Sequence, residues 1–94
     1  MGSGLRELDI SKNKLTGEDV SGVIELIREN VPNLRVINLK DNFLRDQTGE
    51  EIVNALKGNV HLTRVLLELN PLKHYLLKEV ESFGKRNLEN KKEE

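Results

Sequence analysis

Few side chains in this sequence have the types and the spacing that catalysis or metal binding requires. The two histidines are His61 and His74, there is no cysteine, and neither H-x-x-x-H nor H-x-x-E-H spacing occurs, so no metal site is expected. The acid pairs Glu18–Asp19 and Glu50–Glu51 stand where helices are expected to begin, and helix capping explains them better than acid/base catalysis. No Ser/His/Asp set, phosphate-binding loop or dinucleotide fingerprint is present. The sequence therefore predicts a protein with no catalytic residue, no cofactor and no metal, which is not an enzyme.

Asparagine is the residue type whose spacing does stand out, at Asn13, Asn42 and Asn70. Each occupies the asparagine position of a frame L-x-x-L-x-L-x-x-N-x-L, with Ile or Val allowed for Leu. The frame begins at residues 5, 34 and 62, so its periods are 29 (34 − 5) and 28 (62 − 34) residues. Three copies in a fixed frame indicate a repeat architecture. We expect the three amides to lie one above another and to bond backbone groups of the turns.

Each copy of the frame predicts a strand, and the residues after it predict a helix. Strands are expected near residues 6–10 and 35–39 and from Leu62 onward, where apolar and polar residues alternate. Helices are expected to end near Asn30, Gly58 and Asn87. Thr16–Asp19 and Thr48–Glu51 resemble capping boxes at the starts of the first two helices. Pro71 suits the first position of the third helix.

These units predict an α/β solenoid of three strand–turn–helix repeats. A short parallel sheet forms its concave side, helices form its convex side, and the last helix serves as a C-terminal cap. Residues 1–4 read as a cloning remnant and 5–88 as the domain, and we expect the charged residues 89–94 to fray. The repeats span about 5–33, 34–61 and 62–88.

The repeated frame resembles the leucine-rich repeat, and the long period resembles its ribonuclease-inhibitor-like subfamily. Within that subfamily, the segment Ala55–Asn59 (ALKGN) at the end of a helix is similar to tropomodulin-like actin-capping proteins. GTPase activators of the same repeat class use a loop arginine, and no motif singles out one arginine here. The resemblance implies an α/β repeat fold that binds another protein.

Composition narrows the classes of partner. The 15 basic and 16 acidic residues leave a net charge of −1, and aromatic residues make up 3% of the chain, so neither nucleic acid nor a membrane surface is an expected partner. No apolar run of 18 or more residues occurs, as a membrane span would require. No signal peptide is visible, and the absence of cysteine favours an intracellular, cytoplasmic protein.

The variable strand positions of the frame are the predicted binding surface. They stack in rows across the sheet: Glu7, Val36 and Arg64, then Asp9, Asn38 and Leu66, then Ser11, Lys40 and Glu68. Val36 and Leu66 are apolar where the pattern predicts exposure to water, and Leu69 flanks them. The predicted protein-binding residues are Val36, Asn38, Lys40, Arg64, Leu66, Glu68 and Leu69. The alternatives are that the third helix or the tail covers the apolar residues, or that they are isolated exposed side chains.

The first strand, around Arg6 to Ile10, is a second candidate contact. We expect it to be a free sheet edge with Val20, Val23 and Ile27 exposed beside it. Either the chain is part of a longer array or this edge pairs with something, including a second copy of the chain.

Three functions are consistent with the pattern. The preferred one is a non-catalytic interaction module at the C-terminal end of a repeat array, which binds a protein through the concave sheet. The alternatives are a GTPase-activating or actin-capping type of regulator, and an engineered or structural minimal repeat.

Overall fold

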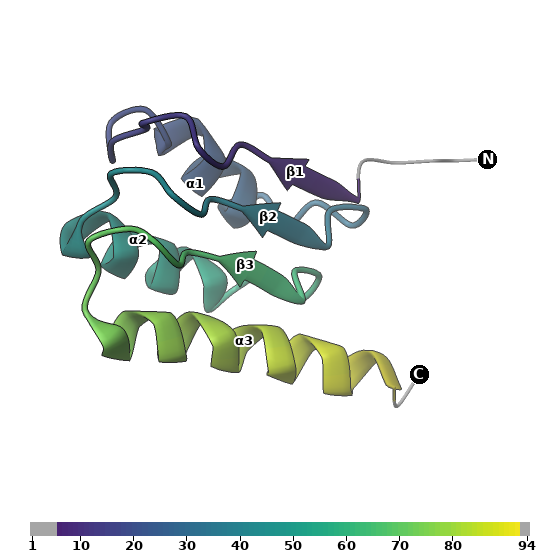
Figure 1. Cartoon of the computed structure of the whole chain (residues 1–94). Helices are drawn as coiled ribbons and strands as arrows, with labels where there is room; N and C mark the ends of the chain where they lie inside the picture. Colours follow the sequence, from purple (N-terminus) through teal and green to yellow (C-terminus); the bar gives the residue numbers. More distant parts are fainter. Residues whose placement is uncertain (1–5, 93–94) are drawn as a thin grey trace.

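The elements follow one another as three strand–helix pairs, in a computed structural model that describes residues 6–92 (Figure 1). The strands are β1 (Glu7–Asp9), β2 (Val36–Asn38) and β3 (Arg64–Leu66), and the helices are α1 (Ser21–Arg28), α2 (Asp46–Leu56) and α3 (His74–Lys92). Leu5, the predicted remnant 1–4 and residues 93–94 lie outside the described residues. No helix within residues 6–92 combines the length and the apolar character needed to cross a bilayer.

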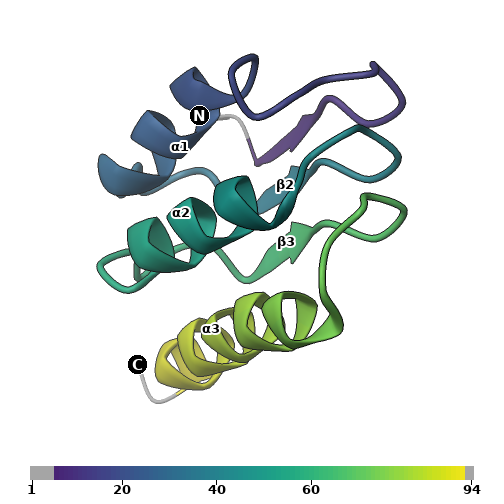
Figure 2. The ribbon, with the colours of Figure 1, turned by 90° about the vertical axis from the view of Figure 1, so that its left-hand side faces the viewer.

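The three strands form one parallel sheet in the order β1-β2-β3. The register pairs Leu8 with Ile37 and Ile37 with Val65. The separations are 29 (37 − 8) and 28 (65 − 37), the same as the periods of the sequence frame. Figure 2 shows α1 and α2 on one side of the strands, with α3 following them below β3. The prediction that the three frames are equivalent strands of a parallel sheet is confirmed.

The leucines and isoleucines of the frame fill the space between the sheet and the helices. Ile37 and Leu39 of the central repeat are fully buried, whereas Leu8 and Ile10 of the first repeat are half-buried. The central repeat is covered by a neighbour on both sides, and β1 has a neighbour on one side only. Burial in this fold therefore depends on the place of a repeat in the stack.

The expectation of exposed residues beside β1 was wrong for two of the three. Val20 and Ile27 are fully buried and Val23 is half-buried. The apolar stripe of α1 belongs to the common core, because it faces the sheet rather than the end of the stack.

The frame asparagines join successive turns, as predicted. Asn42 Oδ1 accepts the N–H groups of Asn13 and Leu15 at 2.9 Å, and its Nδ2 donates to Leu39 O at 3.0 Å. Asn70 repeats the pattern one level on, because its Oδ1 accepts Leu44 N–H at 3.0 Å. These amides pair buried backbone groups that the short strands leave without a partner.

A second row of asparagines joins the helix-to-strand loops. Asn59 Nδ2 donates to Ile27 O at 2.9 Å, and Asn87 Nδ2 donates to Asn59 O at 3.0 Å. Beside it, Arg86 donates to Asn59 O at 2.6 Å and to Leu56 O at 3.4 Å. Leu56 O also accepts Asn59 N–H, and Asn59 O also accepts Asn87 Nδ2–H, so Arg86 adds a second donor to each carbonyl. Its positive charge suits the C-terminal end of the α2 dipole.

Local helix signals were less accurate than the repeat pattern. Thr16 donates its N–H to Asp19 Oδ2 at 2.9 Å, but this pair closes a turn before α1 begins at Ser21. Thr48 is a buried residue inside α2, and α3 begins at His74 rather than near Pro71. Both predictions about those helix starts were wrong, because packing between repeats sets these starts.

The third helix is also longer than expected. It continues to Lys92, so residues 89–92 are helical where a fraying tail was predicted beyond residue 88. The residues after Asn87 include no Gly or Pro, so nothing in the chain stops the helix there.

Candidate functional site

The variable strand positions lie in rows across the sheet. The pairing register aligns Glu7 with Val36 and Arg64, and Asp9 with Asn38 and Leu66. Past the strand ends, Lys12 N–H donates to Lys40 O and Asp41 N–H to Glu68 O, each at 3.0 Å. The predicted stacking of the strand rows is therefore confirmed.

The row of Asp9, Asn38 and Leu66 departs from its own pattern in the third repeat. Asp9 Oδ1 accepts Ser11 Oγ–H at 2.7 Å and Ser11 N–H at 3.0 Å, and these bonds hold the pKa of the Asp9 carboxyl below its ordinary value. Asn38 Oδ1 accepts Lys40 N–H at 3.0 Å in the same way. Leu66 has no side-chain acceptor. The turn bond therefore explains Asp9 and Asn38, but the choice of leucine at position 66 needs another reason.

The predicted binding residues differ in exposure. Val36, Asn38, Lys40 and Leu66 are half-buried, whereas Arg64, Glu68 and Leu69 are exposed. Leu69 is 73% exposed and has a φ of 65°. The equivalent residues Lys12 and Asp41 share this left-handed backbone, with φ values of 60° and 59°. A large exposed apolar side chain on a left-handed backbone is uncommon.

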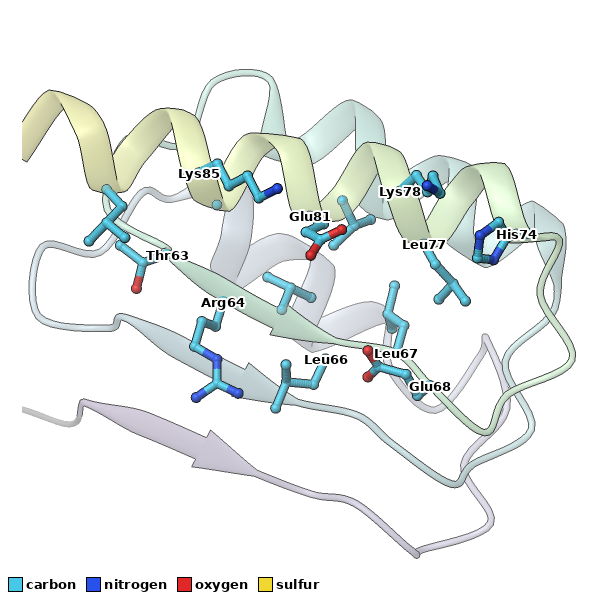
Figure 3. Close-up of a pocket in the computed structure, with 14 residues that line it drawn as sticks. Thr63, Arg64, Leu66, Leu67, Glu68, His74, Leu77, Lys78, Glu81 and Lys85 are labelled. Atoms are coloured by element: carbon cyan, nitrogen blue, oxygen red, sulfur yellow. The ribbon is translucent and has the colours of Figure 1, made fainter.

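An open groove of about 630 Å³ runs between β3 and α3 (Figure 3). From the sheet side it is lined by Arg64, Leu66 and Glu68, and from the helix side by Leu77, Lys78, Glu81 and Lys85. Three of the seven predicted binding residues therefore line it, and Val36, Asn38, Lys40 and Leu69 lie outside it. α3 flanks Leu66, which lines the open groove, and Val36 lies outside that groove. The alternative that the third helix covers both apolar residues stays a prediction.

Sequence reasoning missed the helix side of this groove. Leu77, Glu81, Gly84 and Leu88 recur at helical spacing and so share one face of α3. That spacing was available as a signal. It overlaps the apolar stripe that includes Leu76 and Val80, which are buried, so the spacing alone does not separate the groove face from the core.

Gly84 brings α3 close to the start of β3. An added Cβ at this position would lie 2.3 Å from Thr63 O. Only glycine permits this approach, because backbone atoms cannot move aside as a flexible side chain can. The helix therefore lies directly against the backbone at Thr63, just before β3, where Thr63 and Lys85 line one end of the groove.

The other ionisable side chains that sequence analysis or the pKa shifts single out are explained by hydrogen bonds within the protein or by their place in the groove. Asp19 accepts two hydrogen bonds from Thr16, which lower the pKa of its carboxyl. Glu50 accepts the Tyr75 hydroxyl at 2.9 Å, and this bond raises the pKa of Tyr75. His74 lines the groove. Among residues 6–92, no group of three or more His, Cys, Asp or Glu side chains is arranged to hold a metal ion.

Comparisons with known proteins agree with this geometry. The Leucine Rich Repeat family model matches residues 4–26. The solved structure of leiomodin-1 actin-binding site 2 has a TM-score of 0.71 at 11% identity, over 95% of this chain and 67% of that one. A Caenorhabditis elegans tropomodulin C-terminal domain has a TM-score of 0.53 at 20% identity, over 94% of this chain and 70% of that one. A comparison with curated proteins gave no match.

The two solved structures show a similarity of fold. The comparison with the leucine-rich repeat depends on the sequence and contacts of this chain itself. The family match covers the first repeat, the parallel register joins all three frames, and the asparagine amides link the turns. The chain therefore has the leucine-rich-repeat fold, and its first repeat also matches the sequence model of that family.

Proposed function

We propose that this chain is a non-catalytic module that binds a protein partner on the sheet face, defined by Val36, Asn38, Lys40, Arg64, Leu66, Glu68 and Leu69. The observation that carries the proposal is Leu66, which replaces the turn-bonding Asp9 and Asn38 of the other repeats with an apolar side chain. Together with the exposed Leu69, it gives this face apolar area that the local structure does not use. Such area in a charged surround is typical of a protein contact.

We further propose that the module is the C-terminal end of a ribonuclease-inhibitor-like array with the sheet on its concave side. A full helix between successive strands and periods of 28 and 29 residues support this class. The wider helical layer bends such a stack toward the sheet, which gives a partner a curved surface. A cytoplasmic location stays a prediction from composition.

Actin is the candidate partner that one observation favours. The solved structure with a TM-score of 0.71 is described as an actin-binding site of leiomodin-1. The predicted resemblance to tropomodulin-like proteins agrees with this choice. The actin-capping alternative therefore has more support than the GTPase-activating one. The latter needs a catalytic arginine, and no arginine in the described chain is singled out for that role.

The test is a titration of this chain into purified monomeric actin, with Leu66→Glu and Arg64→Glu as the test variants. Val60→Glu is the matched control, because Val60 is 50% exposed and lies in the loop after α2, away from the sheet face. We expect Leu66→Glu to weaken binding by at least about tenfold, as for a central contact residue, and Val60→Glu to leave it unchanged. Equal effects of Leu66→Glu and Val60→Glu would exclude the sheet face.

Absence of actin binding by the unmodified chain would remove actin as the partner and leave the sheet face to be tested with other proteins. A GTP turnover assay with candidate GTPases separates the GTPase-activating alternative. Acceleration of turnover would contradict a module without a catalytic role.

A further inference from the structure

The helices end and the strands begin along one edge of the stack, which we call the loop edge. It lies on the right in Figure 1, where the strand arrows begin. Its loops are stacked, because Val60 N–H donates to Asn30 Oδ1 at 2.9 Å and Asn87 Nδ2 donates to Asn59 O at 3.0 Å. Equivalent residues of the three repeats therefore form rows along this edge. The loop edge comprises Arg6 and residues 28–35, 57–63 and 85–89.

The loop edge is basic, although the chain as a whole is not. Its six basic residues outnumber the two acidic residues Glu29 and Glu89, so with His61 neutral its net charge is +4 (6 − 2). The turn edge, where strands lead into helices, carries five basic and five acidic residues and has a net charge of 0 (5 − 5). The even charge balance of the chain therefore averages over an uneven distribution. The turn edge comprises residues 11–19, 40–46 and 68–73. The basic residues of the loop edge are Arg6, Arg28, Arg35, Lys57, Lys85 and Arg86.

Most of these bases have no counter-charge within the protein. Within residues 6–92, the only ion pair joins Arg28 Nη1 to Glu25 Oε2, at 2.6 Å. Arg86 donates to backbone carbonyl oxygens rather than to a carboxylate. The Nη1 atom of Arg35 is buried, and no acceptor among the described residues lies within hydrogen-bonding distance of it. A positive charge that is withdrawn from water and unpaired is costly, so an anionic partner beside this edge is stabilising.

An aliphatic row accompanies the basic residues. Val31, Val60 and Leu88 each follow directly after an asparagine of the row that joins the loops. Val60 is 50% exposed, Leu88 is 48% exposed, and Val31 is half-buried. A basic residue precedes each of them by three positions, at the end of its helix. On the strand side, Arg35 N–H donates to Arg6 O at 2.9 Å. The aliphatic row therefore lies between bases at the helix ends and bases at the strand starts.

The chemistry of the loop edge fits an acidic segment of a protein better than a nucleic acid or a bilayer. Four of its six basic residues are arginines, whose planar guanidinium forms two parallel hydrogen bonds with a carboxylate. No residue of the edge is Phe, Trp or Tyr. Single-stranded nucleic acid is bound by aromatic stacking, and bilayer contacts are anchored by Trp and Tyr. An apolar centre inside a polar rim is the usual anatomy of a protein contact.

We propose that the loop edge binds an acidic amphipathic helix of a partner protein. The apolar stripe of that helix lies on Val60 and Leu88, and its flanking carboxylates pair with the bases at the helix ends and strand starts. A helix suits this edge because an apolar stripe with acidic residues on both sides complements the order base, aliphatic, base across the edge. The loop edge shares no residue with the sheet face, so this proposal is independent of partner binding there.

The test is a fluorescence anisotropy titration with a labelled helical peptide of about 18 residues, a length of about 27 Å. The peptide carries Leu at helical spacing and Glu on both sides of the Leu stripe. One matched peptide has Lys in place of every Glu, and another has Ser in place of every Leu. We expect the Glu–Leu peptide to bind at least about tenfold more tightly than either matched peptide. Its binding should weaken as the salt concentration rises.

The double substitution Lys57→Glu with Lys85→Glu reverses the charge beside the aliphatic row. We expect it to weaken binding of the Glu–Leu peptide by about a hundredfold and to strengthen binding of the Lys–Leu peptide, because opposite charges now meet. Lys14→Glu with Lys73→Glu is the control, since it makes the same change of charge on the turn edge, where both residues are exposed. It should leave peptide binding unchanged. Circular dichroism verifies that each variant is folded.

Two further substitutions separate this proposal from binding at the sheet face. Val60→Glu should weaken peptide binding and leave binding at the sheet face unchanged, whereas Leu66→Glu should do the reverse. The proposal is wrong if the Glu–Leu peptide does not bind at millimolar concentration, or if the variant at Lys57 and Lys85 binds it like the unmodified chain. Tighter binding to phosphatidylserine vesicles or to a DNA duplex than to the peptide would overturn the choice of a protein segment.

Discussion

Asn42 illustrates how one side chain holds two repeats together. It is 3% exposed, and its amide bonds the N–H groups of Asn13 and Leu15 as well as the carbonyl oxygen of Leu39. Replacing it by alanine leaves these backbone groups without partners in a dry turn. We expect Asn42→Ala to lower the free energy of unfolding by about 3 kcal/mol, since each unpaired buried group costs about 1–3 kcal/mol. Urea denaturation measures this change.

Asn13→Ala is the matched control for that experiment. Asn13 is exposed, and its Nδ2 bonds only the nearby Ser11 carbonyl at 3.1 Å. The expected cost is below about 1 kcal/mol, as for an ordinary exposed hydrogen bond. Equal costs at the two positions would mean that the links between repeats contribute nothing beyond local turn bonding.

Leu69 is the residue at which binding and stability are expected to oppose each other. Its φ of 65° is strained for leucine, and its side chain is 73% exposed. Asparagine tolerates the left-handed region far better. We expect Leu69→Asn to raise the free energy of unfolding by about 1 kcal/mol and to weaken binding at the sheet face. Loss of stability on this substitution would mean that the leucine packs on the protein itself.

The sequence indicated which residues occupy the variable rows, but it did not indicate the backbone conformation of the turns that follow the strands. The left-handed residues Lys12, Asp41 and Leu69 precede the frame asparagines. None is glycine, so residue type gave no sign of the conformation. The departure at Leu66, by contrast, was visible in the sequence, because its equivalents Asp9 and Asn38 are both polar.

At the level of elements, Gly84 sets the distance between α3 and β3. Its missing Cβ would meet Thr63 O at 2.3 Å. Alanine favours a helix over glycine by about 1 kcal/mol, but here the methyl group must push α3 away from the sheet. We expect Gly84→Ala to cost about 1–3 kcal/mol of stability, the range typical of overpacking. Thermal unfolding followed by circular dichroism gives the change.

Gly22 of α1 provides the opposite case. No atom lies within 4 Å of the place where its Cβ would be. Gly22→Ala should therefore stabilise the protein by about 0.5–1 kcal/mol through helix propensity alone. Stabilisation by both substitutions would show that the contact between α3 and β3 is looser than this geometry requires.

The existence and order of the elements could be predicted, whereas the helix starts could not. The frame fixed all three strands, because a period-2 pattern on a repeat tolerates little slippage. The Thr48–Glu51 signal misled because Thr48 is needed inside α2, where its hydroxyl fills the space that Gly17 leaves open. A short capping pattern carries no information about such a contact between repeats.

At the level of the whole molecule, each repeat depends on its neighbours for burial. The stack was predictable from the periods, but the groove between β3 and α3 was not. Its depth depends on the approach at Gly84 and on the side of α3 that remains without a neighbour in residues 6–92. These are properties of packing rather than of the frame.

The position of a repeat should determine how much a core residue contributes. Leu8 and Ile37 are register partners with equivalent places in the frame, but Ile37 is fully buried and Leu8 is half-buried. We expect Ile37→Ala to lower the free energy of unfolding by about 3–4 kcal/mol and Leu8→Ala by about half as much, because less area and a smaller cavity are involved. Urea denaturation compares the two variants.

Hydrogen exchange on the unmodified protein tests the same gradient without substitution. Amide hydrogens of β2 should exchange only when the whole protein unfolds. Those of α1 should exchange faster, through a local unfolding of the first repeat alone. Uniform protection of the two elements would show instead that the three repeats open as one unit.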